Sequence, residues 1–159
     1  MSQTTLDIKE PGLNALPPGV ERHVVNAGGL TGLQIFPDDE IEIINEEGNQ
    51  ICEIICFDKD GNSELGILNQ KENCKKSFIK ELLKGKDESS LITNLQLKKR
   101  NLDINKSKSS ILFDEQTPNG TKIKIKSKDK CYVIFAAPQN NMLVSEQNPS
   151  SDLTLFIKR

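Results

Sequence analysis

One stretch of the chain, residues 38–57, constrains the fold more than any other. Its sequence, DDEIEIINEEGNQICEIICF, holds two apolar segments separated by turn-forming residues. Isoleucines alternate with acidic residues in the first segment, which is typical of a strand with one buried face. The second segment, Ile51 to Phe57, is almost wholly apolar, which predicts a strand in the middle of a sheet. We therefore expect two strands folded on one tight turn, with the rest of the chain packed around the second.

Other strand-length segments share this apolar character. We expect further strands at 21–26, 33–36, 121–126, 131–137 and 153–157. The continuous apolar segment 131–137 predicts another central strand, whereas the three lysines on one face of 121–126 predict an edge strand. The glycine-rich segment 28–32 predicts a hairpin turn rather than a phosphate-binding loop, because it lacks the lysine of a P-loop and no amphipathic helix follows it.

Helical periodicity is confined to the middle of the chain. Residues 70–84 predict a helix, since Cys74, Phe78 and Ile79 recur at helical spacing and Gly85 follows as a stop signal. A second helix is expected at 89–100, and a short helical turn at 107–113. The second helix is expected to bury three apolar side chains, namely Leu91, Leu95 and Ile92.

These elements predict an α+β fold that is mostly antiparallel β, either a sandwich or a partly closed barrel with one or two helices covering an end. A length of 159 residues is enough for one core, so residues 21–159 are expected to form a single β-rich domain. Residues 1–20 contain three prolines and two glycines, which predicts an irregular lead-in.

Composition argues against several classes of function. A net charge of -2, without a basic patch and with 4% aromatic residues, is atypical of nucleic-acid binding. The sequence shows neither a secretory leader nor an apolar segment long enough to span a bilayer, so we expect a cytoplasmic protein without membrane contact. Three of the four cysteines lie in apolar segments, as free core thiols do in a reducing compartment.

Glu53 is the residue whose position most requires an explanation. A carboxylate inside a central strand is costly unless it is paired, coordinated or at the mouth of the sheet. The candidate partners are His23, Arg22 and Gln50. His23 is the only histidine, which excludes a multi-histidine metal site, and the spacing of Cys52 and Cys56 fits core packing rather than a zinc clamp. We therefore expect a polar binding site at the open end of the sheet, formed by Glu53, Gln50, Arg22 and His23, without a metal.

Some of these residues resemble a known family. The segment Gly48-Asn-Gln-Ile-Cys-Glu53, which follows a strand, resembles the Gly-Asn-Gln-x-x-Asp signature of the urea-carboxylase-associated family, with Glu in place of Asp. Residues 11–25, 28–33, 135–138 and 153–159 resemble the amino-terminal domain that precedes the glycine-cleavage T-protein-like region in a group of bacterial aminomethyltransferases. Members of the urea-carboxylase-associated family also carry a later cysteine-containing metal-binding stretch, to which nothing after Gly61 corresponds here.

The resemblance implies an accessory binding or docking domain of a folate-dependent aminomethyltransferase system, not itself catalytic. Its partner would be a T-protein-like domain or subunit, tetrahydrofolate would bind to that partner and not to this chain, and Glu53 and its neighbours would hold a small-molecule ligand. The alternative is a small metal-assisted enzyme acting on an amine or urea-related metabolite, with Glu53 as general base and a metal held by Glu53 and His23. A third hypothesis makes Glu53 a structural residue, salt-bridged to Arg22, in a scaffold domain.

Overall fold

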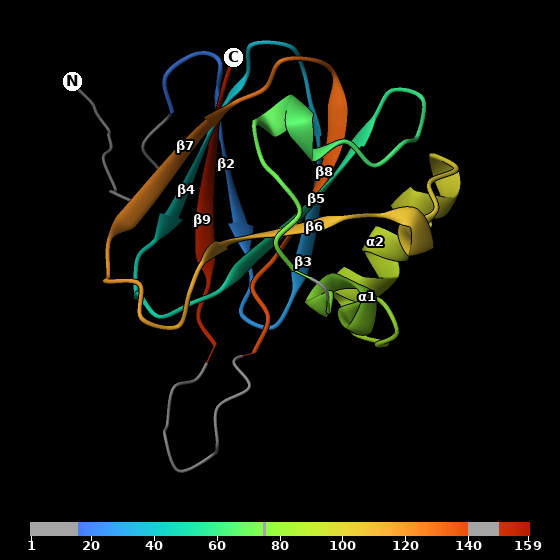
Figure 1. Cartoon of the computed structure of the whole chain (residues 1–159). Helices are drawn as coiled ribbons and strands as arrows, with labels where there is room; N and C mark the ends of the chain where they lie inside the picture. Colours follow the sequence, from blue (N-terminus) through green and yellow to red (C-terminus); the bar gives the residue numbers. More distant parts are fainter. Residues whose placement is uncertain (1–15, 75, 140–149) are drawn as a thin grey trace, which may run out of the picture.

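Two four-stranded antiparallel sheets pack face to face in the computed structural model, which describes residues 16–74, 76–139 and 150–159 (Figure 1). The first sheet has the order β2-β9-β4-β7 and comprises β2 (Val20–Val25), β9 (Leu153–Lys158), β4 (Glu40–Asn45) and β7 (Thr121–Lys126). The second has the order β3-β8-β5-β6 and comprises β3 (Leu30–Ile35), β8 (Cys131–Ala136), β5 (Cys52–Asp58) and β6 (Ser109–Phe113). The predicted mostly antiparallel fold is confirmed, as a sandwich rather than a closed barrel.

Two helices and one 3-10 helix cover the outer face of the second sheet: α1 (Phe78–Leu82), α2 (Glu88–Lys99) and η3 (Ile104–Lys106). A second 3-10 helix, η2 (Leu65–Leu68), packs instead against the core between the two sheets. Figure 1 shows α1 and α2 side by side at the edge of the molecule, on the side of β3, β8, β5 and β6. None of the helices within the described residues is both long and apolar enough to cross a bilayer.

The second sheet is buried on both faces, which explains why β5 and β8 are almost wholly apolar. Alternate residues of β5, such as Cys52, Ile54 and Cys56, enter the core between the two sheets. The intervening Ile55 and Phe57 enter a second core beneath the helices. Both strands lie inside the sheet, as predicted, and the expected edge position of β7 is also confirmed. Three of the cysteines are buried, and all four are free thiols.

Both hairpins expected from turn chemistry are wrong. β4 pairs with β7 and β9, whereas β5 pairs with β6 and β8, so residues 46–51 carry the chain from one sheet to the other. The glycine-rich segment 28–32 likewise lies between β2 and β3, which belong to different sheets. The turn residues specify a reversal of the chain, but they do not specify whether the next strand pairs with the previous one or faces it across the core.

The helix predictions are partly correct. The helix expected at 89–100 is α2, but that expected at 70–84 shrinks to α1. The helical turn expected at 107–113 is not formed, because residues 109–113 are strand β6. Tertiary contacts override the helical pattern, because Asn73 lies along the free edge of β6. Its side chain accepts a hydrogen bond from Ile111 N at 2.7 Å and donates one to Ile111 O at 3.2 Å. The free backbone N–H and C=O groups of this edge strand are thereby hydrogen-bonded by an extended segment, where the sequence pattern predicts a helix.

Candidate functional site

Glu53 is fully buried, and its carboxylate binds the amino-terminal end of α1. Its side chain lies on the face of β5 that Ile55 and Phe57 share, beneath the helices. One oxygen accepts the Ser77 hydroxyl at 2.6 Å, and the other accepts the backbone N–H groups of Phe78 at 2.7 Å and Ile79 at 3.2 Å. Backbone N–H groups at a helix start are donors without partners in the helix, and they favour a negative charge. The carboxylate is thus compensated by a helix end rather than by a cation.

Gln50 is also fully buried, and it joins three segments of the chain. Its amide nitrogen donates to the carbonyls of Ile51 and Pro138, both at 2.8 Å, and its oxygen accepts Ser151 N at 2.7 Å. Gly48 has a φ of 75°, and a side chain there would collide with the backbone of Asn119. The segment 48–53 that carried the family resemblance is therefore built into the packing at the start of β5.

Arg22 and His23 lie in the other sheet, on strand β2. Arg22 is exposed, and His23 Nε2 lies 3.1 Å from the carboxylate of Glu21. That hydrogen bond lowers the pKa of Glu21, which also pairs with Arg159. The structure therefore does not bring together the four residues predicted to form a site. Glu53 and Gln50 are buried among other partners, and the pairings of Glu53 with Arg22 and of Glu53 with His23 are not observed.

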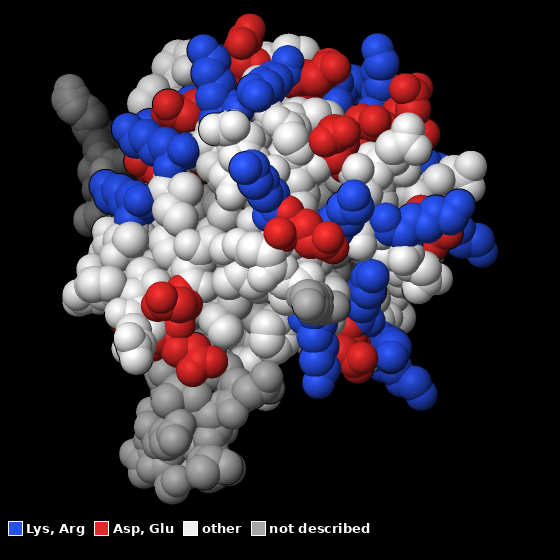
Figure 2. Space-filling view, in the orientation of Figure 1, with Lys and Arg blue, Asp and Glu red and all other residues white. Residues whose placement is uncertain are grey.

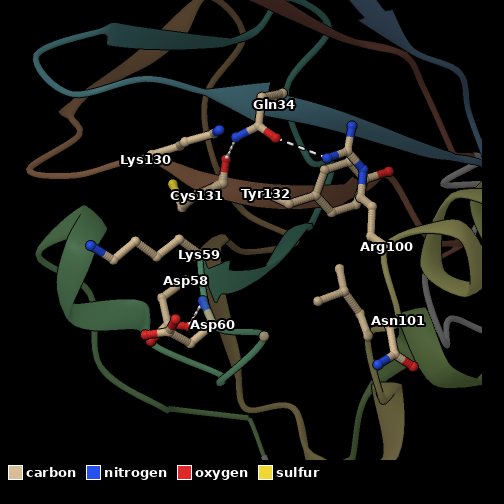
Figure 3. A pocket seen from close by; sticks show the side chains of 11 residues that line it. Gln34, Asp58, Lys59, Asp60, Arg100, Asn101, Lys130, Cys131 and Tyr132 are labelled. Atoms are coloured by element: carbon tan, nitrogen blue, oxygen red, sulfur yellow. Dashed lines mark hydrogen bonds between the residues drawn. The ribbon is translucent and has the colours of Figure 1, made fainter.

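A polar cavity lies elsewhere, at the end of the second sheet where β8 begins between the ends of β3 and β5. Its volume is about 320 Å³. Four segments line it: Gln34 of β3, residues 58–61 after β5, residues 100–102 after α2, and residues 130–132 at the start of β8. Figure 3 shows Lys59 and Lys130 on one side of this cavity and Arg100 on the other. We call it the β3–β5–β8 cavity.

Arg100 is held in place by its neighbours in the cavity wall. Its guanidinium group lies 4.4 Å from the centre of the Tyr132 ring and donates to Gln34 Oε1 at 2.8 Å. The Gln34 amide in turn donates to the Cys131 carbonyl at 2.8 Å (Figure 3). A guanidinium that stacks on an aromatic ring and is fixed by an amide is pre-organised to bind an oxyanion or a polarised oxygen.

Tyr132 contributes a buried hydroxyl to this region. The residue is 5% exposed, and its hydroxyl has no hydrogen-bond partner among the described residues. The hydroxyl lies over Gly32 of β3, where an added Cβ would collide with it. Burial raises the pKa of Tyr132, and the charge of Arg100 opposes that rise. A buried hydroxyl without a partner is costly, so it is a feature that packing alone does not explain.

Carboxylates also line the cavity, beside the cations. Asp58 Oδ1 accepts the backbone N–H groups of Asp60 and Asn62, both at 2.9 Å, which fixes the turn after β5. The cavity thus presents Asp58 and Asp60 together with Lys59, Lys130 and Arg100. Such a site can bind a small dipolar molecule. Within residues 16–74, 76–139 and 150–159, there is no group of three His, Cys, Asp or Glu side chains that could hold a metal ion, either in this cavity or outside it.

Sequence reasoning missed this cavity because its residues are scattered over four segments. The turn 57–63 was visible as turn chemistry, and the basic residues 98–100 were visible as a helix end. These segments come together only because β8 lies between β3 and β5 in the sheet. The single tyrosine within the continuous apolar segment of β8 was the one available signal, since buried tyrosines usually find a hydrogen-bond partner.

Fold and cavity together define a two-sheet sandwich with a small polar cavity at one end of the helix-covered sheet. No family model matches the chain, so its resemblance to the urea-carboxylase-associated family stays a prediction. The chain is, however, 34% identical over 152 residues to a protein of Ruegeria pomeroyi named trimethylamine-oxide aldolase. The match covers 96% of this chain but only 19% of the relative, so the chain spans about a fifth of the length of the curated protein it matches.

This comparison corrects the function expected from the sequence. The relative is named as an enzyme, and the match runs through nearly all of this chain. The prediction of an accessory or docking domain that is not itself catalytic, belonging to an aminomethyltransferase system, is therefore wrong. The alternative, an enzyme acting on an amine-related metabolite, agrees better with the relative's name.

Proposed function

We propose that this chain functions in an enzyme that cleaves a small amine oxide, with trimethylamine N-oxide as its substrate. The observation that carries the proposal is the 34% identity to a trimethylamine-oxide aldolase, which extends over 96% of the chain. Identity spread over a whole domain indicates a shared core and shared surface features, not only a short common motif. We further propose that the enzyme works in the cytoplasm, where free buried thiols are stable.

The proposed reaction is redox-neutral and needs no external oxidant. An aldolase releases an aldehyde, and the one-carbon aldehyde available from trimethylamine N-oxide is formaldehyde. The N–O bond and one C–N bond break, the oxygen moves to the carbon of that methyl group, and one hydrogen of that methyl group passes to the nitrogen. The products are dimethylamine and formaldehyde, which together contain every atom of the substrate. The nitrogen is reduced while the carbon is oxidised.

The β3–β5–β8 cavity has properties suited to this substrate. Its volume of about 320 Å³ lies at the lower end of the range usual for ligand pockets, which favours a small molecule. An N-oxide presents a negative oxygen next to a positive nitrogen. Arg100, Lys59 and Lys130 supply donors for the oxygen, while Asp58 and Asp60 supply negative charge for the amine side. We propose that these groups orient the N–O dipole and stabilise the charge that shifts when the bond breaks.

Two further expectations remain proposals. Formaldehyde is reactive, and tetrahydrofolate is a chemically suitable acceptor for it; we propose that any such acceptor binds to a T-protein-like partner region and not to this chain. A metal held jointly by Glu53 and His23 does not enter the proposal, because both Glu53 oxygens bind the start of α1 and His23 lies in the opposite sheet. The amine-directed alternative is therefore kept without those two ligands.

The cavity is tested by binding of trimethylamine N-oxide to the chain, measured by calorimetry, in the wild type and in two variants. Lys130→Met and Arg100→Ala each remove one donor, and we expect each to weaken binding by at least about tenfold, the usual effect of losing a charge-assisted hydrogen bond. Lys122→Met is the matched control, because Lys122 is an exposed lysine on β7, away from the cavity. Wild-type affinity in both cavity variants would refute this placement of the substrate.

A further inference from the structure

The orientation of α2 is the reverse of what its sequence predicts. The face turned toward the sheet carries Ser90, Thr93 and Leu97, which are buried. The opposite face carries Leu91, Ile92 and Leu95, whose exposed fractions are 52%, 52% and 65%. The sequence predicts these three side chains as the buried stripe of the helix. We call the exposed set, Leu91, Ile92 and Leu95, the α2 apolar face.

Hydrogen bonds to the preceding segment fix this orientation. The Ser90 hydroxyl donates to the Leu82 carbonyl at 2.6 Å, and the Asn94 amide donates to the Leu83 carbonyl at 2.8 Å. Leu97 of the same helix face packs in the core beneath the helices. Turning the helix to bury its leucines would break both hydrogen bonds and expose Leu97. The α2 apolar face therefore stays at the surface of this chain, and α2 itself lies on the outside of the molecule (Figure 1).

Charges at the two ends of α2 indicate what covers this face. Glu88 lies at the amino-terminal end, and Lys98 and Lys99 lie in the last turn. Positions 88, 92, 95 and 99 share one side of a helix, because they recur at intervals of three and four residues. The helix thus offers an acidic end, an apolar middle and a basic end, all on one side. Figure 2 shows acidic and basic side chains interspersed on the visible face of the molecule. The acidic–apolar–basic order is therefore a property of α2 and not part of a larger charge pattern on that face.

We propose that the α2 apolar face binds the same face of a second copy of this chain, with the two helices antiparallel. A two-fold axis halfway between Ile92 and Leu95 is also halfway between Glu88 and Lys99. One operation therefore places Ile92 against Leu95 of the partner subunit and Glu88 against Lys99 of the partner subunit. Antiparallel helices also align their dipoles favourably, and two-fold dimers are the commonest protein assemblies.

The experiment is sedimentation equilibrium of the chain over a range of micromolar concentrations, with folding of every variant checked by far-UV circular dichroism. We expect a monomer–dimer equilibrium for the wild type. Leu95→Glu is expected to weaken the dimer by at least about tenfold, because it places a charge in the apolar contact. The same change at Leu16, an exposed leucine outside α2, is the control and should leave the dimer unchanged.

A charge exchange tests the antiparallel arrangement itself. Glu88→Lys alone should weaken the dimer, because it sets a lysine against Lys99 of the partner subunit. Adding Lys99→Glu should restore the dimer, since opposite charges then face each other again. Each change is unfavourable for the dipole of α2 itself, so a recovery cannot come from a more stable helix. A monomeric wild type, or a double variant that dimerises no better than Glu88→Lys, would overturn the proposal.

Discussion

Replacing Glu53 tests whether the buried carboxylate holds α1 in place. It accepts three hydrogen bonds, from the Ser77 hydroxyl and from the N–H groups of Phe78 and Ile79. Glu53→Ala would leave these donors without a partner in a site that is fully buried. Loss of one partner from a buried, charge-assisted set typically costs about 3–5 kcal/mol of unfolding free energy. For a chain of this size we expect a decrease of roughly 6–20 °C in Tm.

Glu53→Gln separates the effect of charge from that of shape. The amide keeps one oxygen for the two backbone N–H groups, but its nitrogen must donate to the Ser77 hydroxyl. That hydroxyl already accepts Lys80 N at 3.2 Å, and its own O–H would lose the acceptor that Glu53 provides. We expect a loss of about 1–2 kcal/mol, between the wild type and the alanine variant.

Urea unfolding measured by far-UV circular dichroism gives these free energies. The chain has no tryptophan, so intrinsic fluorescence is a weaker probe. Glu47→Gln is the matched control, because Glu47 is exposed and its replacement should change stability by less than about 0.5 kcal/mol. If Glu53→Ala were no less stable than this control, the assignment of Glu53 to the start of α1 would be refuted.

Three further predictions concern the cavity wall and the start of β5. Tyr132 is the only tyrosine, so absorbance at 295 nm follows its ionisation alone. Because its folded-state pKa is raised, the titration midpoint of the folded chain should lie above that of the chain unfolded in urea, and Arg100→Ala should raise the midpoint further. The free energy of unfolding should fall as the pH rises through the folded-state pKa. A midpoint equal to that of the unfolded chain would contradict this burial. Gly32→Ala should destabilise the fold by about 1–3 kcal/mol in urea unfolding, because its Cβ would meet the Tyr132 hydroxyl. This loss of stability should be smaller in a Tyr132→Phe background, and equal losses in both backgrounds would disprove the contact. Gln50→Ala should cost about 1–3 kcal/mol, since it leaves buried groups such as Ser151 N without a partner, whereas an unchanged urea midpoint would show that these bonds contribute nothing.

The sequence predicted what depends on local pattern. The strands β5 and β8 are apolar on both faces, and this alone placed them inside a sheet with layers on either side. It also showed that Glu53 needs a partner. The sequence could not show which partner, because the unpaired N–H groups at the start of α1 come close to Glu53 only when that helix packs against β5.

What the sequence did not show depends on which segments pair. Turn residues at 45–49 look the same whether the chain forms a hairpin or crosses to the facing sheet, and here it crosses. The orientation of α2 was missed for a related reason. Its apolar periodicity points to Leu91 and Leu95, but the hydrogen bond from Ser90 to the Leu82 carbonyl turns these side chains outward.

Cleavage of an amine oxide is tested most directly by carbon NMR of a reaction mixture, in which the protein produced from its own gene is incubated with uniformly ¹³C-labelled trimethylamine N-oxide. Labelled dimethylamine and labelled formaldehyde should appear in equal amounts, and both should form more slowly with Lys130→Met than with Lys122→Met. Unchanged substrate, or dimethylamine without formaldehyde, would contradict the proposed function.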